Sequence, residues 1–225
     1  MSASDDVILQ LAGQLEGEVR SDRVSRLLYR TDASIYEIEP VGVVLPRTVE
    51  DVERTTRWAA AHGIPLLPRG AGTSLAGQAV GACLHVDFSV HLHRLLELDV
   101  AGRWVRVEPG IVLDDLNARL KPHGLVLGAD VATSSRATIG GMIGNNSSGA
   151  HSLLYGKTSE QVLELDVVLA DGTRTTLRPL GPAELAAAVG AADRIGSLCG
   201  RIDALVRENA AEIDARFPKV MRRVS

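Results

Sequence analysis

Apolar residues along the first ninety positions follow a strand–helix–strand order. Helical spacing from 6–18 predicts a short amphipathic helix. The continuous apolar run 41–45 predicts a buried strand, and 49–62 repeats with a helical period. Shorter apolar runs at 65–68 and 84–88 predict two more strands. Strands that alternate with a helix favour a small parallel α/β unit.

The helix over 49–62 has start and stop signals of its own. Thr48 can cap its first turn, and Asp51 takes the place of the usual Glu or Gln of a capping box. Gly63 offers the left-handed position that ends a helix. Both ends are therefore specified by local chemistry.

The pattern changes after residue 90. The stretches 95–98 and 104–108 alternate as an antiparallel pair turned at Ala101-Gly102, and 162–170 pairs with 173–177 across Asp171-Gly172. Helical spacing appears at 111–122, ended by Gly124, and again over 182–217 with a break near Gly190. We expect a second, mainly antiparallel lobe followed by helices.

Composition narrows the class of protein. The chain has 225 residues, of which 45% are hydrophobic and 3% aromatic, so its core must be aliphatic. Its formal net charge of −4, without a basic stripe, argues against nucleic acid as a partner. Cys83 and Cys199 form no CxxC pair, and neither a signal peptide nor a membrane span is evident. We expect a cytoplasmic protein.

Two glycine-rich segments carry the candidate chemistry. The first, PRGAGTSLAGQ, covers 68–78, and the second, ATIGGMIGNNSSGA, covers 137–150. Glycine admits positive φ and close approach, and successive free N–H groups in such a bend form an anion-binding nest. A plain tight turn needs fewer glycines than either segment has. We therefore expect both bends to grip one long dinucleotide at its diphosphate.

Glycines at 140, 141 and 144 disfavour an isolated helix by roughly 1 kcal/mol each. A helix that starts at Thr138 therefore needs a packing reason, in the form of close contact with a strand or a ligand. The alternative is a polar loop that closes a helix. The nearby Asn145, Asn146 and Ser147 could bond a ring edge or a ribose.

Other motifs fail on spacing. A Rossmann fingerprint beginning at Gly70 would need glycine where Leu75 stands, and a phosphate loop ending in GKT would need glycine at His151. His85, His91 and His93 have no partner at metal-ligand spacing. We therefore predict no metal site. Paired acids, Asp114 and Asp115, fit the first turn of a helix rather than a catalytic pair.

The order of these segments resembles a known family. PRGAGTSLAGQ, VRVEPGIVLDDLN and ATSSRATIGGMIGNNSSGAHSLLYGKTSEQVLELDVVLADG are similar to the FAD-binding domain of the vanillyl-alcohol-oxidase or p-cresol methylhydroxylase (PCMH) type. The nearest branch is the FAD-linked D-2-hydroxyacid dehydrogenases, which include D-lactate dehydrogenase, the glycolate oxidase flavin subunit and D-2-hydroxyglutarate dehydrogenase. TDASIYEIEPVGVVLPRT resembles the lead-in of the long bacterial members, which carry an iron–sulfur module.

The resemblance implies a residue for each part of FAD. The first loop would wrap the diphosphate, the second segment would line the ribityl chain and ring, and a proline–glycine pair and a later valine would lie near adenine. The implied cofactor-binding residues are Arg69, Gly70, Ala71, Gly72, Thr73, Ser74, Leu75, Gln78, Pro109, Gly110, Thr133, Ser134, Thr138, Gly140, Gly141, Gly144, Asn145, Ser148, Gly149, Tyr155 and Val167. Members with covalent flavin often carry histidine where Thr73 stands, so we expect non-covalent FAD.

The same resemblance implies an α+β fold in two lobes, a small parallel α/β lobe and a mainly antiparallel one with helices, with FAD in the cleft between them. We expect a helical lead-in at 1–35, the PCMH-type FAD-binding domain at 36–180 with lobes of about 36–90 and 91–180, and a truncated helical insertion at 181–225. The family's later G-S-E-G-T segment and its substrate domain, with metal-binding and catalytic histidines, are absent. The chain thus resembles an N-terminal fragment.

The implied activity is the FAD-dependent oxidation of a D-2-hydroxyacid to the 2-oxoacid, with an iron–sulfur module or a quinone as electron acceptor. The hydroxyacid would be held by the missing substrate domain, so no catalytic residue is assigned here and the chain alone should be inactive. A cytoplasmic location, including the inner face of the membrane, fits this activity. The alternative is a non-catalytic FAD-binding module or a remnant.

Overall fold

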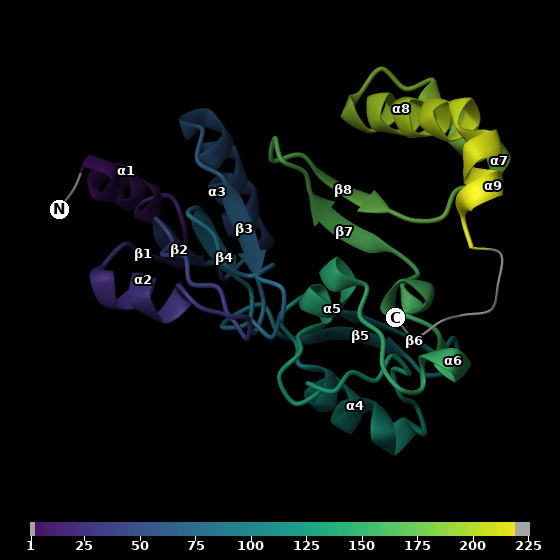
Figure 1. The fold of residues 1–225 in the computed structure, drawn as a ribbon, viewed down its shortest axis with the longest axis horizontal. Coiled ribbons are helices and arrows are strands. Elements are labelled where there is room, and N and C mark those ends of the chain that lie inside the picture. Colours follow the sequence, from purple (N-terminus) through teal and green to yellow (C-terminus); the bar gives the residue numbers. More distant parts are fainter. Residues whose placement is uncertain (1–2, 219–225) are drawn as a thin grey trace.

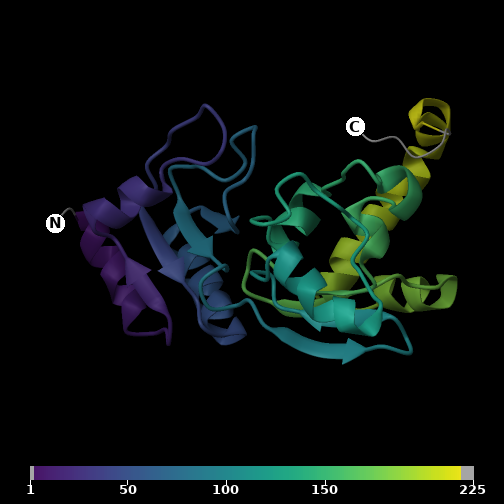
Figure 2. The ribbon, with the colours of Figure 1, turned by 90° about the horizontal axis from the view of Figure 1, so that it is seen from below.

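The computed structural model describes residues 3–218, and these form two lobes (Figure 1). The N-terminal lobe runs to the end of β4 (Leu84–Asp87), and the second lobe begins with β5 (Leu95–Asp99). Figure 2 shows the two lobes side by side, with the C-terminal helices behind the second. The expected two-lobed α+β architecture is confirmed.

A four-stranded sheet is the centre of the N-terminal lobe. Its order is β1-β2-β4-β3, and β2, β4 and β3 are parallel. The edge strand β1 is antiparallel to β2. The sheet is therefore mixed, whereas the sequence pattern predicts a purely parallel one. The bounds are β1 Glu18–Arg20, β2 Gly42–Leu45, β3 Leu66–Arg69 and β4 Leu84–Asp87.

Helix α3 (Val49–His62) forms as its sequence signals predict. The Thr48 hydroxyl accepts from the N–H of Asp51, and Gly63 ends the helix in the left-handed region. The Asp51 side chain, fully buried, also accepts backbone N–H bonds from Glu16, Gly17 and Arg47. This carboxylate fixes the segment before β1 against the start of α3.

The N-terminal helix differs from its prediction. Helix α1 covers Ala3–Ala12, whereas the apolar spacing extends to residue 18. The chain leaves α1 in a turn, where the Gln14 N–H donates to Leu11 O at 2.9 Å. Gly17 then lies against the Leu45 carbonyl with no room for a Cβ, just before β1. A second helix, α2 (Arg23–Tyr29), is capped by Asp22. Ile8 and Leu11 of α1 pack in the core with Trp58.

The second lobe has its own aliphatic core. Strands β5 (Leu95–Asp99) and β6 (Trp104–Val107) pair antiparallel, and α4 and α5 pack with them around Ile111, Leu116 and Met142. The predicted helix at 111–122 is α4 over Leu113–Leu120, followed by a 3-10 turn at Lys121–His123. The remaining elements are α5 Ile139–Asn145, α6 Ser152–Tyr155, a 3-10 turn at Thr158–Gln161, β7 Leu165–Val168 and β8 Arg174–Leu177.

The C-terminal segment is helical, as predicted. It divides into α7 (Pro182–Val189), α8 (Arg194–Glu208) and α9 (Ala210–Arg216), with a second break at Asn209 that the sequence pattern does not indicate. The last predicted insertion residues, 219–225, lie outside the described part of the chain, as do residues 1–2. Within residues 3–218, no helix is both long and apolar enough to cross a bilayer.

Candidate flavin site

The first glycine segment is a loop that leaves the end of β3. Gly72 and Gly77 hold φ values of 67° and 77°, which side chains disfavour. Within residues 3–218, the backbone N–H groups of residues 70–75 have no hydrogen-bond acceptor. Six successive unused donors in a bend with a left-handed residue are what an anion-binding nest requires.

The second glycine segment is built differently. Thr138 caps α5 by accepting from Gly141 N at 3.3 Å, and the N–H groups of Ile139 and Gly140 donate to the carbonyls of Ile111 and Pro109 at 2.9 and 2.8 Å. The first-turn donors of α5 are therefore occupied by protein. The expectation of two nests at one diphosphate is wrong for this helix start, because its N–H groups close the lobe's own structure.

Close packing accounts for one glycine of α5. A Cβ on Gly140 would lie 2.7 Å from Pro109 Cβ and 3.0 Å from its carbonyl oxygen. This is the packing reason that a glycine-containing helix requires. Gly144 differs, since a Cβ there would meet nothing within 4 Å.

The two segments nevertheless meet. Gly70 lies so close to the Thr138 hydroxyl that a Cβ would overlap it. Gln78 Nε2 donates to Asn145 Oδ1 at 3.2 Å, which joins the far end of the first loop to the end of α5. The structure thus brings the open donors of 70–75 beside α5, from opposite lobes of the chain.

Pro109-Gly110 lies at the joint between the lobes. Gly110 N donates to Leu92 O at 2.7 Å, and the carbonyls of Phe88 and Leu92 leave no room for a Cβ on Gly110. Pro109 is bound to α5 as described above. This pair therefore connects the end of β4 to the second glycine segment.

The remaining predicted cofactor-binding residues lie outside the first loop and α5. Thr133 and Ser134 form a turn before α5, in which the Thr133 carbonyl accepts from two N–H groups and Ser134 O from Asp114 N. Gly149 packs against the Asp130 backbone, and Tyr155, 45% exposed, packs on Gly128. Val167 lies on β7, where it pairs with Thr175 of β8. Its hairpin meets α3, where Arg57 Nη1 donates to Gly172 O at 3.1 Å.

Sequence reasoning missed a strap over the first loop, residues 29–37. Ala33 N donates to Gly72 O at 3.0 Å, and the Asp32 carboxylate accepts from Ala79 N at 3.2 Å. The Tyr36 ring lies against Gly77. The available signal was Asp32 followed by Ser34, whose N–H donates to Asp32 Oδ1 at 2.8 Å in an Asx turn.

Burial and hydrogen bonding shift the pKa values of two groups near the first loop, Asp32 and His85. Burial alone would raise the pKa of Asp32, but hydrogen bonds from Ser34 and Ala79 N–H hold it below its ordinary value. Burial lowers the pKa of His85, fully buried on β4, to about 4, so this ring is neutral near pH 7. His85 faces Tyr29 edge-on, and Arg69 and Asp87 act on its charge.

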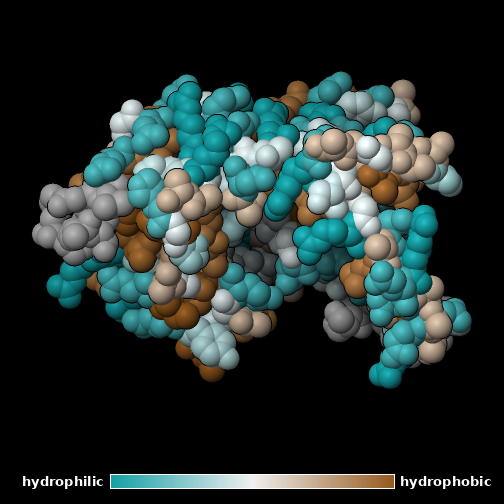
Figure 3. Space-filling view, turned by 90° about the horizontal axis from the view of Figure 1, so that it is seen from above, coloured by the Kyte–Doolittle hydropathy of each residue, from teal (hydrophilic) through white to brown (hydrophobic). Residues whose placement is uncertain are grey.

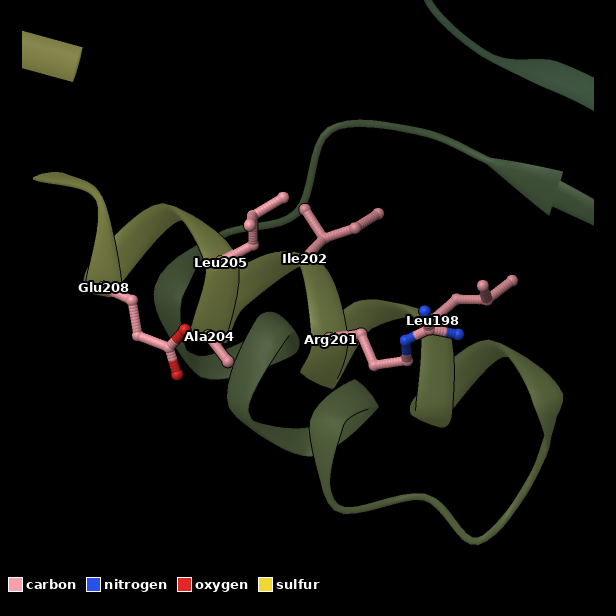
Figure 4. Close-up of a pocket in the computed structure, with 6 residues that line it drawn as sticks. All are labelled: Leu198, Arg201, Ile202, Ala204, Leu205 and Glu208. Carbon is pink, nitrogen blue, oxygen red and sulfur yellow. The ribbon is translucent and has the colours of Figure 1, made fainter. Parts of the chain in front are cut away.

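A second candidate surface lies away from the glycine segments. A shallow hollow on α8 is lined by Leu198, Arg201, Ile202, Leu205 and neighbouring side chains, and Ile202 and Leu205 project together from one side of the helix (Figure 4). Both are 61% exposed. Hydrophobic residues also interrupt the polar surface elsewhere on the molecule (Figure 3). Its lining is mostly aliphatic, with Arg201 and Glu208 as the charged members, and it lies apart from both glycine segments, so we do not assign it to the cofactor.

Comparison with known proteins identifies the family. The profile described as "FAD binding domain" matches residues 40–178. The chain belongs to this FAD-binding domain family. Solved structures agree in fold: alkyldihydroxyacetonephosphate synthase has a TM-score of 0.68 at 22% identity over 77% of this chain and 34% of its own. p-Cresol methylhydroxylase with bound substrate has a TM-score of 0.68 at 19% identity over 78% and 36%.

Curated relatives include D-2-hydroxyglutarate dehydrogenase of Pseudomonas putida, which is 41% identical over 210 residues. That match covers 92% of this chain and 21% of the relative. Glycolate oxidase subunit GlcD of Bacillus subtilis is 35% identical over 153 residues, 65% of this chain and 32% of the relative. The chain thus spans about a fifth of the length of the D-2-hydroxyglutarate dehydrogenase.

Among residues 3–218, no three His, Cys, Asp or Glu side chains are grouped closely enough to hold a metal ion. Cys83 is buried and free, and Cys199 is free and half-buried. His85, one of the three histidines that the sequence singles out, is fully buried on β4.

Proposed function

We propose that this FAD-binding domain holds one FAD without a covalent bond, across the first glycine loop and α5. The single observation that carries the proposal is the run of unused N–H donors at 70–75, seated against Thr138 of the other segment. FAD has the length to contact both segments, and its diphosphate has the charge that such donors favour.

The residues fit the parts of the cofactor as follows. Backbone N–H groups of the first loop would hold the diphosphate, with Gln78 beside them. The second segment would line the ribityl chain and ring, and Pro109-Gly110 would approach the adenine half. These roles rest on the family resemblance and on the contact of Gly70 with Thr138 and Gln78 with Asn145. Thr73, in the place where related proteins carry a linking histidine, supports non-covalent binding.

We further propose that the domain belongs to an enzyme that oxidises a D-2-hydroxyacid to the 2-oxoacid. The names of its relatives, D-2-hydroxyglutarate dehydrogenase and glycolate oxidase subunit, support this substrate class. Bound flavin supplies the two-electron chemistry, while the protein binds and orients it. We assign no catalytic base to this chain, and we place the hydroxyacid in a substrate domain outside it, with an iron–sulfur module or a quinone as electron acceptor.

Domain limits and location belong to the same proposal. We place the FAD-binding domain at 36–180, close to the family match at 40–178. We also place the protein in the cytoplasm, including the inner face of the membrane, and its two free cysteines support a reducing compartment. The competing function is a FAD-binding module without catalysis. The exposed apolar side chains of α8 instead favour a chain whose surface is covered by a further part of a larger protein.

The test is a FAD titration of the purified chain, followed by flavin fluorescence and absorbance. We expect quenching with a shifted flavin spectrum for the wild type. Gly72→Val should abolish both, because Val at a φ of 67° is strained and its Cβ would lie 2.6 Å from Arg69 Nη2. Gly13→Val is the matched control, since a Cβ there meets nothing within 4 Å.

A folded chain that leaves the flavin spectrum unchanged would overturn the cofactor assignment. A chain that binds FAD should still fail to reduce a dye with D-lactate, because we place the hydroxyacid in a substrate domain outside residues 1–225. Dye reduction by this chain alone would contradict the placement of the substrate site elsewhere.

A further inference from the structure

The guanidinium of Arg69 lies directly beneath the first glycine loop. Its Nη1 donates to the carbonyls of Tyr29 at 3.2 Å and Ala79 at 2.5 Å, and its Nη2 donates to Thr31 O at 2.8 Å. Its central carbon lies 5.3 Å from the centre of the Tyr29 ring. One side chain therefore bonds three backbone carbonyls from two distant segments.

These contacts close the loop at both ends. Arg69 is the last residue of β3, where the loop begins, and Ala79 lies where it ends. Tyr29 and Thr31 open the strap, whose Ala33 N–H binds the loop at Gly72 O. The position of a Cβ on Gly72 would be 2.6 Å from Nη2, so the bend of the loop rests on the guanidinium.

The positive charge of Arg69 has no direct counterion. Among residues 3–218, no carboxylate comes within 4.0 Å of its guanidinium. The nearby Asp87 side chain is engaged by the Tyr29 hydroxyl at 2.6 Å and by Ser89. Arg69 is half-buried, so its charge is partly removed from water, and an anion bound nearby would compensate for that cost. Here that cation underlies six unused N–H donors.

We propose that Arg69 is a positioning residue for the diphosphate, which rests on the FAD assignment above. Its bonds to three carbonyls hold the N–H groups of 70–75 in register before the ligand arrives, and its charge favours an anion over them. The strap is thereby part of the cofactor site, although it precedes the residues of the family match. Arg69 acts through the loop.

The experiment compares Arg69→Met and Arg69→Lys with Arg119→Met. Arg119 is exposed on α4, so its variant removes the same charge from a remote surface. Binding of FAD and of ADP is measured by calorimetry, and the ³¹P resonances of bound FAD are recorded. We expect Arg69→Met to weaken both ligands roughly tenfold or more, since hydrogen bonds and a charge are lost together. Arg119→Met should bind as the wild type does.

Arg69→Lys separates the two parts of the proposal. It keeps the charge but lacks the planar fork that reaches several carbonyls at once. We expect intermediate affinity and ³¹P shifts nearer to those of the wild type than Arg69→Met gives. Lysine no better than methionine would overturn the role of charge, and equal affinity in all variants would overturn the whole proposal. Failure of the wild type itself to bind FAD would instead refute the cofactor assignment.

A second variant covers the case in which Arg69→Met does not fold. Asp32→Asn leaves the guanidinium in place and weakens the bond that the strap makes with Ala79 N–H. Hydrogen exchange should then rise at Ala33 and Ala79, whose N–H groups join the strap to the loop, in the ligand-free protein while β4 stays protected, with weaker FAD binding. Unchanged exchange and affinity would overturn the part assigned to the strap.

Discussion

The two glycine-rich segments have similar compositions and opposite uses of the backbone. The loop at 70–78 leaves its N–H groups open and is supported from below by Arg69. In the segment at 137–150, the N–H groups at the start of α5 donate to the carbonyls of Ile111 and Pro109. Glycine therefore accompanies open N–H donors in one segment and close packing in the other. Counting glycines does not separate these uses, whereas the hydrogen-bond partners do.

The largest expected effect is a loss of folding stability in acid, caused by His85 near Arg69 beneath the first loop. His85 is buried, and desolvation lowers its pKa from 6.5 in the unfolded chain to about 4. Protons therefore bind the unfolded state preferentially as pH falls from 6.5 to 4. The folded protein should lose up to roughly 3 kcal/mol over that window from this group.

Urea unfolding at several pH values measures this loss. His85→Gln should flatten the pH dependence between 6.5 and 4, because the titrating ring is gone. His93→Gln, at an exposed position, should leave the dependence as it is. Parallel pH curves for wild type and His85→Gln would contradict the assigned burial effect.

The next effect should break the second segment while sparing the first. Gly140→Ala places a Cβ 2.7 Å from Pro109 Cβ and should lower the free energy of unfolding by about 2 kcal/mol, as overpacked sites do. Gly144→Ala is the matched change in the same helix, where a Cβ meets open space, and should stabilise by up to about 1 kcal/mol. Chemical denaturation distinguishes the two, and equal effects would show that packing does not set the need for glycine.

The smallest effect concerns the bond that joins the segments. Gln78 and Asn145 share an exposed hydrogen bond of 3.2 Å between neutral groups. A double-mutant cycle with Gln78→Ala and Asn145→Ala should give a coupling of about 0.5 kcal/mol in unfolding. If FAD contacts both residues, the coupling in FAD binding should exceed that value. Strictly additive single changes in both measurements would mean that the segments act independently.

Local signals explain which elements the sequence predicts well. Helix α3 begins after Thr48 and ends at Gly63 as expected, because each end is set by a residue's own chemistry. Strand β1 was not predicted, since three residues become a strand only through pairing with β2. The end of α1 was placed too late, because the apolar period continues to residue 18 whereas the chain already turns after Ala12, where Gln14 N–H donates to Leu11 O.

In the candidate site too, local features were predictable from the sequence and long-range contacts were not. Both glycine segments and their family were predictable from residue order alone, because glycine marks where backbone comes close to something. The partner of that close approach was not predictable. Pro109 against Gly140 and the strap over Gly72 join residues distant in sequence, and only the folded chain reveals them.

The anchorage of Arg69 has a consequence for how the first loop behaves in acid. Its three acceptors are backbone carbonyls, which take up no proton at any pH at which the protein is handled. Ion pairs elsewhere, such as Arg94 with Glu108, weaken once their carboxylates are neutralised. The three Arg69 bonds contain no titratable acceptor, so acid acts on this bend through its neighbours, His85 on β4 and the Asp32 carboxylate of the strap.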